Sequence, residues 1–315
     1  MSVVVDRPRI ILDCDPGLDD AMALAIALHD ADVVGITTVG GNVGVERTTA
    51  NALALCDLLG RSEVQVHAGH DMPINGSLEH RATEYHGPNG TGSVTLPEPS
   101  RPATSSDAVD WIIDTIRSEA ELWLVATGPL TNIAHAFQTA PDIVERLAGI
   151  SWMGGSSTAG NTTPAAEFNA WVDPEAAEIV FRSGIKNLTM AGLNVTHTVL
   201  LDRPWIDQLR RDIANPGLVV FADLLDYYEA RQRELTTLAG AAVHDALAVL
   251  HVTNRPLMAG LRRRVEVITG SGPTRGMTMV DQRPRRHPDA ANALVLDWAD
   301  ADGIRSALHS ALTTA

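Results

Sequence analysis

The chain has 315 residues, of which 45% are hydrophobic and 20% charged, a composition typical of a soluble globular protein with a sizeable core. Its 24 basic and 39 acidic residues give a formal net charge of −15, which argues against nucleic acid and anionic membranes as partners because both bind a basic face. Two cysteines, Cys14 and Cys56, are too few for a disulfide framework or a zinc knuckle.

The N-terminal stretch MSVVVDRPRIILD lacks the positive start and long apolar run of a secretory leader. No apolar run along the chain approaches the length that spans a membrane. We therefore expect a cytoplasmic protein.

Short apolar or β-branched runs alternate along the chain with helix-length amphipathic stretches. The predicted strands are Arg9–Asp13, Val33–Val39, Val64–Ala68, Leu122–Ala126, Ile150–Met153 and Leu188–Leu193. The predicted helices lie near residues 19–29, 46–60, 105–119, 130–139, 174–183 and 202–213. This alternation is typical of an α/β protein with a mostly parallel, open sheet flanked by helices on both faces.

Two long segments, residues 70–104 and 154–170, are rich in glycine, proline and polar residues and are predicted to be irregular loops. Long loops in a compact domain usually form lids or binding loops, and disorder is the alternative. Beyond residue 214 the pattern is helical, and strand-like runs follow near 264–269, 276–281 and 292–297 before a final helix. Since no linker divides the chain, a single domain over residues 1–315 is expected.

Residues 13–20, DCDPGLDD, place four aspartates directly after the first predicted strand. Ligands of open parallel sheets bind beyond the carboxyl ends of the strands. Asp19 and Asp20 fall at the start of the next helix, where capping alone could account for them. Asp13 and Asp15 gain nothing from capping, so a bound cation explains the group better.

Carboxylates without clustered histidine or cysteine indicate a hard cation, Ca²⁺ or Mg²⁺. The spacing differs from that of an EF-hand, so further ligands must come from other strand ends. Asp245 is the best candidate, because His244 and Asp245 open a helical stretch in AAVHDALAVL. Helix capping is the alternative for Asp245.

The chain resembles the nucleoside hydrolases, the inosine–uridine-preferring nucleoside N-ribohydrolase family. The resemblance rests on motifs in family order: DCDPGLDD at 13–20, ITTVGGN at 36–42, HG at 86–87, ATGPLTNIA at 126–134, WMGGS at 152–156, AEFNAWVDPEAA at 166–177 and AAVHD at 241–245. It implies a nucleoside-hydrolase-like, Rossmann-related fold and Ca²⁺-dependent hydrolysis of ribonucleosides to free base and ribose. It also implies a small-molecule ribonucleoside as substrate and a homodimer or homotetramer.

The resemblance assigns the Ca²⁺ ion to Asp15, Asp20, the backbone carbonyl of Thr127, and Asp245. Remaining positions would go to the ribose hydroxyls and a water, which suits an ion that accepts six to eight oxygens. Asp15 would also accept the proton of that water. His244 would protonate the leaving base.

The family match also assigns residues that contact the substrate. Those that hold the ribose are Asp19, Asn42, Asn161, Glu167 and Asn169, and the others placed at the substrate are Met153, Phe168 and His86. His86 lies in the first long loop, which would have to close over the ligand. If the EFN triplet at 167–169 is extended, Glu167 and Asn169 share one face and Phe168 takes the other.

Base preference should come from the helical stretch before His244. Tyr228, Gln232 and Thr236 follow a helical i, i+4, i+8 spacing there, and Tyr228 and Gln232 are predicted to bind the base. A glutamine at the middle position is similar to what pyrimidine-preferring members of the family carry, since its amide can both donate to and accept from a uracil edge. The other two positions match neither the purine nor the pyrimidine pattern, so it is through the glutamine that the resemblance favours pyrimidine nucleosides. The alternative is that all three residues form solvated helix surface.

Two other functions share these features. A calcium-dependent nucleoside-binding protein without turnover would use the same binding residues. A metal-dependent phosphohydrolase also begins with an aspartate pair after a strand, but it normally needs a lysine to stabilise the transferred phosphoryl group. Lys186 is the only lysine, and it precedes a predicted strand, so it should lie at the opposite edge of the sheet from the aspartates.

Overall fold

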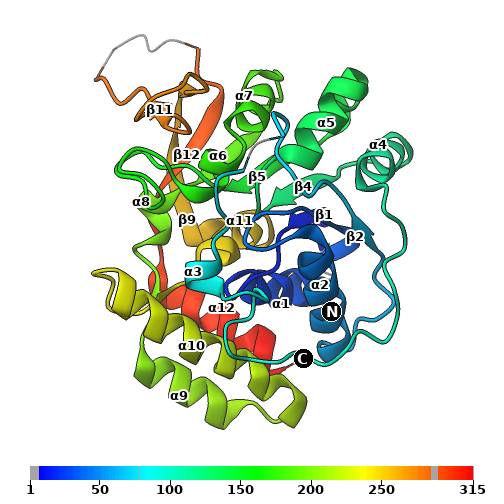
Figure 1. Ribbon diagram of the computed structural model, residues 1–315, viewed down its shortest axis with the longest axis vertical. Helices are drawn as coiled ribbons and strands as arrows, with labels where there is room; N and C mark the ends of the chain where they lie inside the picture. The colour runs from blue at the N-terminus through cyan, green and yellow to red at the C-terminus, as the bar shows by residue number, and fades with distance from the viewer. Residues whose placement is uncertain (1–6, 77, 285–289, 315) are drawn as a thin grey trace, which may run out of the picture.

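A computed structural model describes residues 7–76, 78–284 and 290–314, so residues 1–6 of the stretch examined for a leader lie outside it. Its centre is an eight-stranded sheet in the order β3-β2-β1-β4-β5-β6-β12-β9 (Figure 1). All neighbours in it pair in parallel except β9, the antiparallel edge strand beside β12. The strands are β1 (Arg9–Cys14), β2 (Asp32–Thr38), β3 (Val66–Ala68), β4 (Trp123–Ala126), β5 (Gly149–Met153), β6 (Leu188–Ala191), β9 (Met258–Arg263) and β12 (Ala293–Ala299).

Helices cover both faces of this sheet, as predicted. The α-helices are α1 (Asp20–Asp30), α2 (Val45–Leu58), α3 (Thr83–His86), α4 (Ala108–Ser118), α5 (Thr131–Thr139), α6 (Phe168–Val172), α7 (Pro174–Arg182), α8 (Leu193–Thr196), α9 (Arg203–Asp212), α10 (Val219–Leu235), α11 (His244–Thr253) and α12 (Ala301–Thr313). One face carries α1, α2, α11 and α12, and the other carries α4, α5 and α7 (Figure 1).

The alternation of side chains along β1 shows why a central strand of such a sheet is apolar throughout. Ile10 and Leu12 point into the core beneath α1 and α11, and Ile11 points into the core beneath α4 and α5. All three are fully buried. Because both faces of a parallel sheet are covered, its strands are continuous apolar runs without polar alternation.

The six strands and six helices predicted up to residue 213 are all present, within a few residues of the predicted bounds. The prediction missed β9, whose sequence MAGLRR combines a glycine with two arginines and so lacks an apolar run. The runs predicted near 264–269 and 276–281 form β10 (Val265–Val267) and β11 (Thr278–Val280), an antiparallel pair outside the main sheet. A second small pair joins β7 (Leu200–Leu201) to β8 (Ala241–Ala242).

The two segments predicted as irregular loops contain short helices at the edge where the strands end. Residues 70–104 include the single turn α3, and residues 154–170 run into α6, which begins at Phe168. The segment that carries Tyr228 and Gln232 is α10. Each of these three helices contributes side chains to one cavity, which Thr127 and Met153 at the carboxyl ends of β4 and β5 also line.

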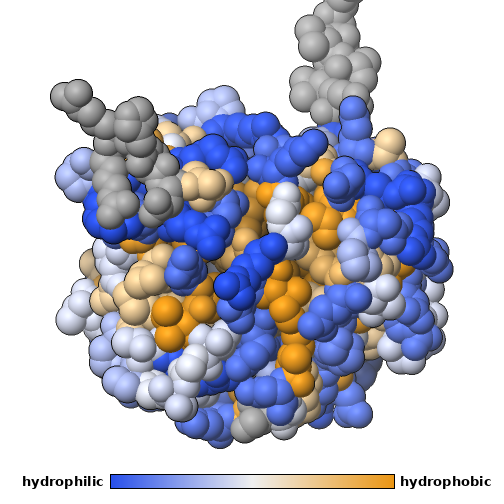
Figure 2. Space-filling view, turned by 90° about the horizontal axis from the view of Figure 1, so that it is seen from above, coloured by the Kyte–Doolittle hydropathy of each residue, from blue (hydrophilic) through white to orange (hydrophobic). Residues whose placement is uncertain are grey.

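Among the described residues, no helix is long and apolar enough to cross a membrane. Viewed from above, the surface shows a hydrophobic strip with hydrophilic residues around it (Figure 2). Within the described ranges, the large hydrophobic side chains that are exposed are Met72, Leu261, Met279 and Trp298.

Candidate active site

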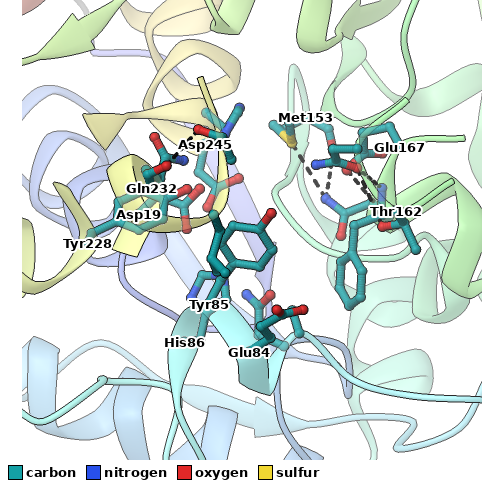
Figure 3. A pocket seen from close by; sticks show the side chains of 18 of the residues that line it. Asp19, Glu84, Tyr85, His86, Met153, Thr162, Glu167, Tyr228, Gln232 and Asp245 are labelled. Carbon is teal, nitrogen blue, oxygen red and sulfur yellow. Dashed lines mark hydrogen bonds between the residues drawn. The ribbon is translucent and has the colours of Figure 1, made fainter. Parts of the chain in front are cut away.

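A cavity of ≈ 680 Å³ lies above the carboxyl ends of the parallel strands, between α3, α10 and the segment leading into α6 (Figure 3). Thirteen of the fifteen residues predicted for the site line it: Asp19, Asn42, His86, Thr127, Met153, Asn161, Glu167, Phe168, Asn169, Tyr228, Gln232, His244 and Asp245. The two others, Asp15 and Asp20, are buried and bonded to residues of this wall. The structure therefore brings together residues spread over more than two hundred positions of the chain.

Three buried carboxylates meet at one side of the cavity. Ligand oxygens of Asp19, Asp20 and Asp245 all lie within 4.8 Å of one another. Burial and the charge of Asp20 raise the pKa of Asp19 to about 8. Burial and the charges of Asp19 and Asp20 raise the pKa of Asp245 well above its ordinary value. A hard cation bound here would relieve this repulsion, so the donor set fits a metal of the kind predicted.

Asp15 lies next to these carboxylates, although it is outside the group of three. Its Oδ2 accepts the backbone N–H of Asn42 at 2.7 Å, while its buried Oδ1 has no hydrogen-bond partner. Burial and the charge of Asp20 raise the pKa of Asp15 well above its ordinary value. A buried carboxylate oxygen without a partner is costly, and a cation or a donating water would satisfy it.

Capping does not account for the aspartates at the start of α1. Asp19 occupies the N-cap position, but its side chain makes no capping hydrogen bond. Asp20 accepts the backbone N–H of Gly17 at 3.0 Å and the hydroxyl of Thr127 at 2.8 Å. These bonds tie the first residue of α1 to the Pro16–Gly17 turn that follows β1 and to Thr127, which directly follows β4.

Asp13 lies behind the site at the end of β1 and supports it through a buried network. Its Oδ1 accepts the hydroxyl of Thr37 and, at 2.8 Å, the amide of Asn132. The same Asn132 amide donates to the Thr38 carbonyl, and its oxygen accepts the N–H of His70. Burial raises the pKa of Asp13 to about 6, and its two hydrogen bonds oppose that rise. Asn132 was not among the predicted residues, because its partners come from distant segments.

The wall opposite the aspartates is built around Asn169 and Glu167. The Asn169 side-chain amide donates to the carbonyl of Thr127 at 2.9 Å and to that of Met153 at 3.0 Å. Glu167 accepts the backbone N–H groups of Asn169, Ala170 and Gly155. Burial raises the pKa of Glu167 to about 7, although these three bonds oppose that rise.

The EFN triplet is not extended, because Glu167 is the N-cap of α6 and Phe168 begins that helix. Glu167 and Asn169 are nevertheless both buried, while Phe168 is half-buried and stacks towards Trp171 with ring centroids 6.4 Å apart. Asn161 is exposed and accepts the Phe168 N–H. Helix capping, and not strand alternation, places the Glu167 and Asn169 side chains on the cavity side.

The wall predicted to face the base carries Tyr228, Gln232 and His86. Tyr228 and Gln232 are only 3% exposed, so they are not solvated helix surface. The Gln232 Oε1 accepts the Ala242 N–H at 2.8 Å. This bond fixes which end of the amide carries the oxygen, so the NH₂ group is directed away from Ala242. Thr236 lies beyond the end of α10 and does not continue its face, although it still lines the cavity.

His86 is held in a defined orientation despite its place in a long loop. It ends α3, is buried, and its Nδ1 accepts the N–H of Leu18 at 3.1 Å. Burial lowers its pKa to about 4, so the ring is neutral near pH 7. Because Nδ1 accepts, the proton is on Nε2, and that nitrogen is a donor.

His244 begins α11 directly before Asp245. Its Nδ1 lies 2.7 Å from the hydroxyl of Thr196, and the ring of His197 is 5.4 Å away. Burial and the charges of His197 and His86 lower the pKa of His244 to about 3. The ring is therefore neutral near pH 7 and can bond a leaving base through its second nitrogen.

Several lining residues were not predicted, among them Tyr85, Glu84, His197 and Thr162. Figure 3 shows the Tyr85 side chain pointing into the middle of the cavity, between the Asp245 side and the Glu167 side. Tyr85 and Glu84 belong to α3, within the segment predicted to be irregular. A glycine-rich loop sequence offers no periodicity from which the direction of a side chain could be predicted.

Comparison with known proteins gives a consistent result. The family described as inosine-uridine preferring nucleoside hydrolase matches residues 10–306. The pyrimidine-specific ribonucleoside hydrolase RihA of Salmonella paratyphi B is 41% identical over 276 residues, which cover 86% of this chain and 88% of the relative. RihA of Salmonella arizonae is 42% identical over the same length and coverage.

Solved structures agree over nearly the whole chain. A purine-preferring ribonucleoside hydrolase from Gardnerella vaginalis is 35% identical with a TM-score of 0.90, and the match covers 97% of this chain and 98% of that one. The plant nucleoside hydrolase PpNRh1 is 31% identical with a TM-score of 0.89, and the match covers 98% of this chain and 100% of that one. The chain therefore belongs to the inosine-uridine preferring nucleoside hydrolase family and is an enzyme that hydrolyses the N-glycosidic bond of ribonucleosides.

Proposed function

We propose that this nucleoside hydrolase is Ca²⁺-dependent and prefers pyrimidine ribonucleosides. The observation that carries the calcium proposal is the group of buried carboxylates Asp19, Asp20 and Asp245 beside the unpartnered Oδ1 of Asp15. An all-oxygen donor set with flexible geometry suits Ca²⁺. Asp15, Asp20, the Thr127 carbonyl and Asp245 would hold the ion, which when bound would orient and polarise a water and the ribose hydroxyls.

Asp15 is the proposed general base. Its Oδ1 has no hydrogen-bond partner, and its Oδ2 is fixed by the N–H of Asn42, so the free oxygen has a defined position from which to accept a proton. A base held in place before the reaction needs no reorientation in the transition state.

Five residues are proposed to bind the ribose: Asp19, Asn42, Asn161, Glu167 and Asn169. All five line the cavity, and they lie on both sides of it. Asp19 lines the cavity whereas Asp15 does not, which supports a substrate-facing role for Asp19. Loss of the base develops positive charge on the ribose, which the buried carboxylates would stabilise.

Departure of the base is assigned to His244 and His86. Both are buried, neutral near pH 7 and part of the cavity wall. His86 has its Nε2 proton available because Nδ1 is engaged by Leu18. A hydrogen bond to the leaving nitrogen lowers the barrier without a charged imidazole in the resting enzyme.

The pyrimidine preference rests on Gln232. Since its oxygen is engaged by the Ala242 N–H, the amide is expected to act mainly as a donor, a narrower role than the donor-and-acceptor pairing inferred from sequence. Pyrimidine carbonyls are suitable acceptors for it. The Salmonella relatives, at 41% and 42% identity, are named pyrimidine-specific, whereas the Gardnerella structure at 35% identity is named purine-preferring.

A phosphohydrolase finds no support in the arrangement of cations. Lys186 is exposed and precedes β6, so it lies at the opposite edge of the sheet from the aspartates. The cavity lining includes one arginine, Arg81, which pairs with Asp71. A transferred phosphoryl group would lack the dedicated positive charge that such chemistry requires.

The test is release of reducing sugar from uridine, cytidine, inosine, adenosine and guanosine, with calcium or with a chelator. We expect the two pyrimidine nucleosides to react fastest and chelation to abolish turnover until calcium is restored. Binding of uridine without release of ribose from any nucleoside would identify a binding protein and overturn the proposal. Much faster turnover of inosine than of uridine would overturn the base preference, and activity insensitive to chelation would overturn calcium dependence.

A further inference from the structure

The base side of the cavity depends on a short segment, residues 80–86, that has little regular structure of its own. It contributes His80, Arg81, Tyr85 and His86, among others, to the cavity wall. Within it, α3 is a single turn, in which the Ala82 carbonyl accepts the N–H groups of Tyr85 and His86. One helical turn is not stable by itself, so contacts with other elements must hold it.

Two arginines bind the backbone around this segment. Arg81 itself donates to the Val43 carbonyl at 2.8 Å and pairs with Asp71. Arg231, on α10, donates through Nη2 to the Glu84 carbonyl at 2.8 Å. The second contact is notable because it joins α3 to the helix that carries Tyr228 and Gln232.

The Glu84 carbonyl needs a partner from outside its helix. The last carbonyls of a helix have no intrahelical donor, and a cationic side chain is a favourable partner for them. The Thr83 carbonyl accepts the Gly87 N–H and the His86 carbonyl accepts the Gly92 N–H, whereas Glu84 receives the Arg231 guanidinium. The Arg231 side chain is 25% exposed and Glu84 lies at the surface, so this bond is in contact with water and gains its strength from the charge of the guanidinium.

Arg231 lies on the same helix, α10, as Tyr228 and Gln232, the residues proposed to face the base. Tyr228 lies one turn earlier, with its ring 5.9 Å from that of His86. Tyr227 packs against Gly92, where an added Cβ would lie 2.3 Å from its ring. The residue that Arg231 holds, Glu84, directly precedes Tyr85 and His86, so fixing its carbonyl fixes the backbone of both cavity residues.

We propose that Arg231 is a positioning residue that holds α3 against α10 and so pre-forms the base side of the active site. Among the described residues, its partners are the Glu84 carbonyl and Glu234, and none of the carboxylates Asp15, Asp19, Asp20 and Asp245 is one of them. This inference rests on the proposed function, because its consequences appear in nucleoside turnover. Without the contact, a bound nucleoside would have to order α3 itself. The apparent affinity for the nucleoside would then fall in proportion to the fraction of enzyme molecules in which α3 is already in place.

The test compares R231M and R231K with the matched control E234Q in the calcium-loaded full chain. R231M keeps the apolar stem but removes the donors, and R231K restores one donor and the charge. E234Q removes the exposed ion-pair partner of Arg231, at 64% exposure, while leaving the bond to Glu84. The measurements are KM and kcat for uridine.

We expect R231M to raise KM about tenfold, the size expected for one charge-assisted hydrogen bond, with kcat within about twofold of the original enzyme. R231K should recover part of the affinity, and E234Q should behave as the original. An unchanged KM in R231M, or a lower kcat with unchanged KM as a less folded enzyme would give, would overturn the inference. If the original enzyme releases no ribose from uridine, the proposed function itself fails, which is a separate result.

Discussion

Removal of calcium should destabilise the fold as well as stop turnover. Asp15, Asp19, Asp20 and Asp245 are buried together; burial raises the pKa of each of them, and neighbouring charges add to the rise for Asp15, Asp19 and Asp245. Raised carboxyl pKa values mean that the ionised forms are unfavourable in the metal-free protein. A bound divalent cation compensates these charges and binds the folded state alone, because the unfolded chain does not bring the four residues together.

The size of the effect follows from binding linkage. At a free calcium concentration one hundred times Kd, binding stabilises the folded state by about 2.7 kcal/mol. An unfolding entropy of about 2.1 cal/mol/K per residue amounts to about 0.66 kcal/mol/K for 315 residues. The melting temperature should therefore rise by about 4 °C when calcium is added to the chelated protein.

The assay is thermal unfolding in chelator, in excess calcium and in excess magnesium. D20N should lose the calcium-dependent shift, because Asp20 is a proposed ligand. D173N serves as the control, since Asp173 is buried but bonded to Thr131, Ile74 and Ala176 away from the site. Equal melting temperatures with and without calcium, or an undiminished shift in D20N, would refute the reasoning, and an equal shift with magnesium would refute the choice of ion.

Three further predictions address single residues. D15N should still bind uridine in equilibrium binding but lose about 10²- to 10⁴-fold in turnover, and near-normal kcat would remove Asp15 as the base. Q232L should lower the ratio of kcat/KM for uridine over inosine at least about tenfold, since a lost donor leaves a base carbonyl unpaired; an unchanged ratio would show that Gln232 does not select the base. The third prediction concerns His251, which does not line the cavity and hydrogen-bonds Thr189 through Nε2. Burial lowers the pKa of His251 to about 4. Below pH 6.5 the unfolded state therefore binds a proton that the folded state rejects, so stability is lost as pH falls from 6.5 towards 4, by about 2 kcal/mol at pH 5. Urea unfolding of H251Q at pH 7.5 and pH 5 should lack this loss, and an identical pH dependence in both proteins would contradict the assignment.

Much of the fold could be predicted because its signals are local. The strand around Ile10 to Leu12 is an apolar run of the length that a covered strand requires, and the helix that follows begins at the expected aspartates. Edge strand β9 was missed because its sequence carries no local signal of this kind. Its Arg262 is exposed and Arg263 half-buried, so the strand is identified only by its pairing with β12.

In the candidate site, too, some features had local signals in the sequence and others depend on contacts between distant segments. The group DCDPGLDD indicated a cation site because so many carboxylates in one turn need a positive partner. The sequence alone could not assign Asn132, Arg231 or Ala242 to the site, because each acts on a residue at least ten positions away. It left open whether the EFN triplet is extended, and the structure shows a helix N-cap there.

The sequence by itself determined the alternation of strands and helices, the edge of the sheet where ligands bind and the acidic chemistry of that edge. Each of these follows from composition and spacing within a few residues. Tertiary structure alone decided which carboxylate oxygen lacks a partner, which way the Gln232 amide turns and how α3 is held over the cavity. Those features depend on hydrogen bonds between segments far apart in the chain, and such bonds exist only once the sheet has brought the segments together.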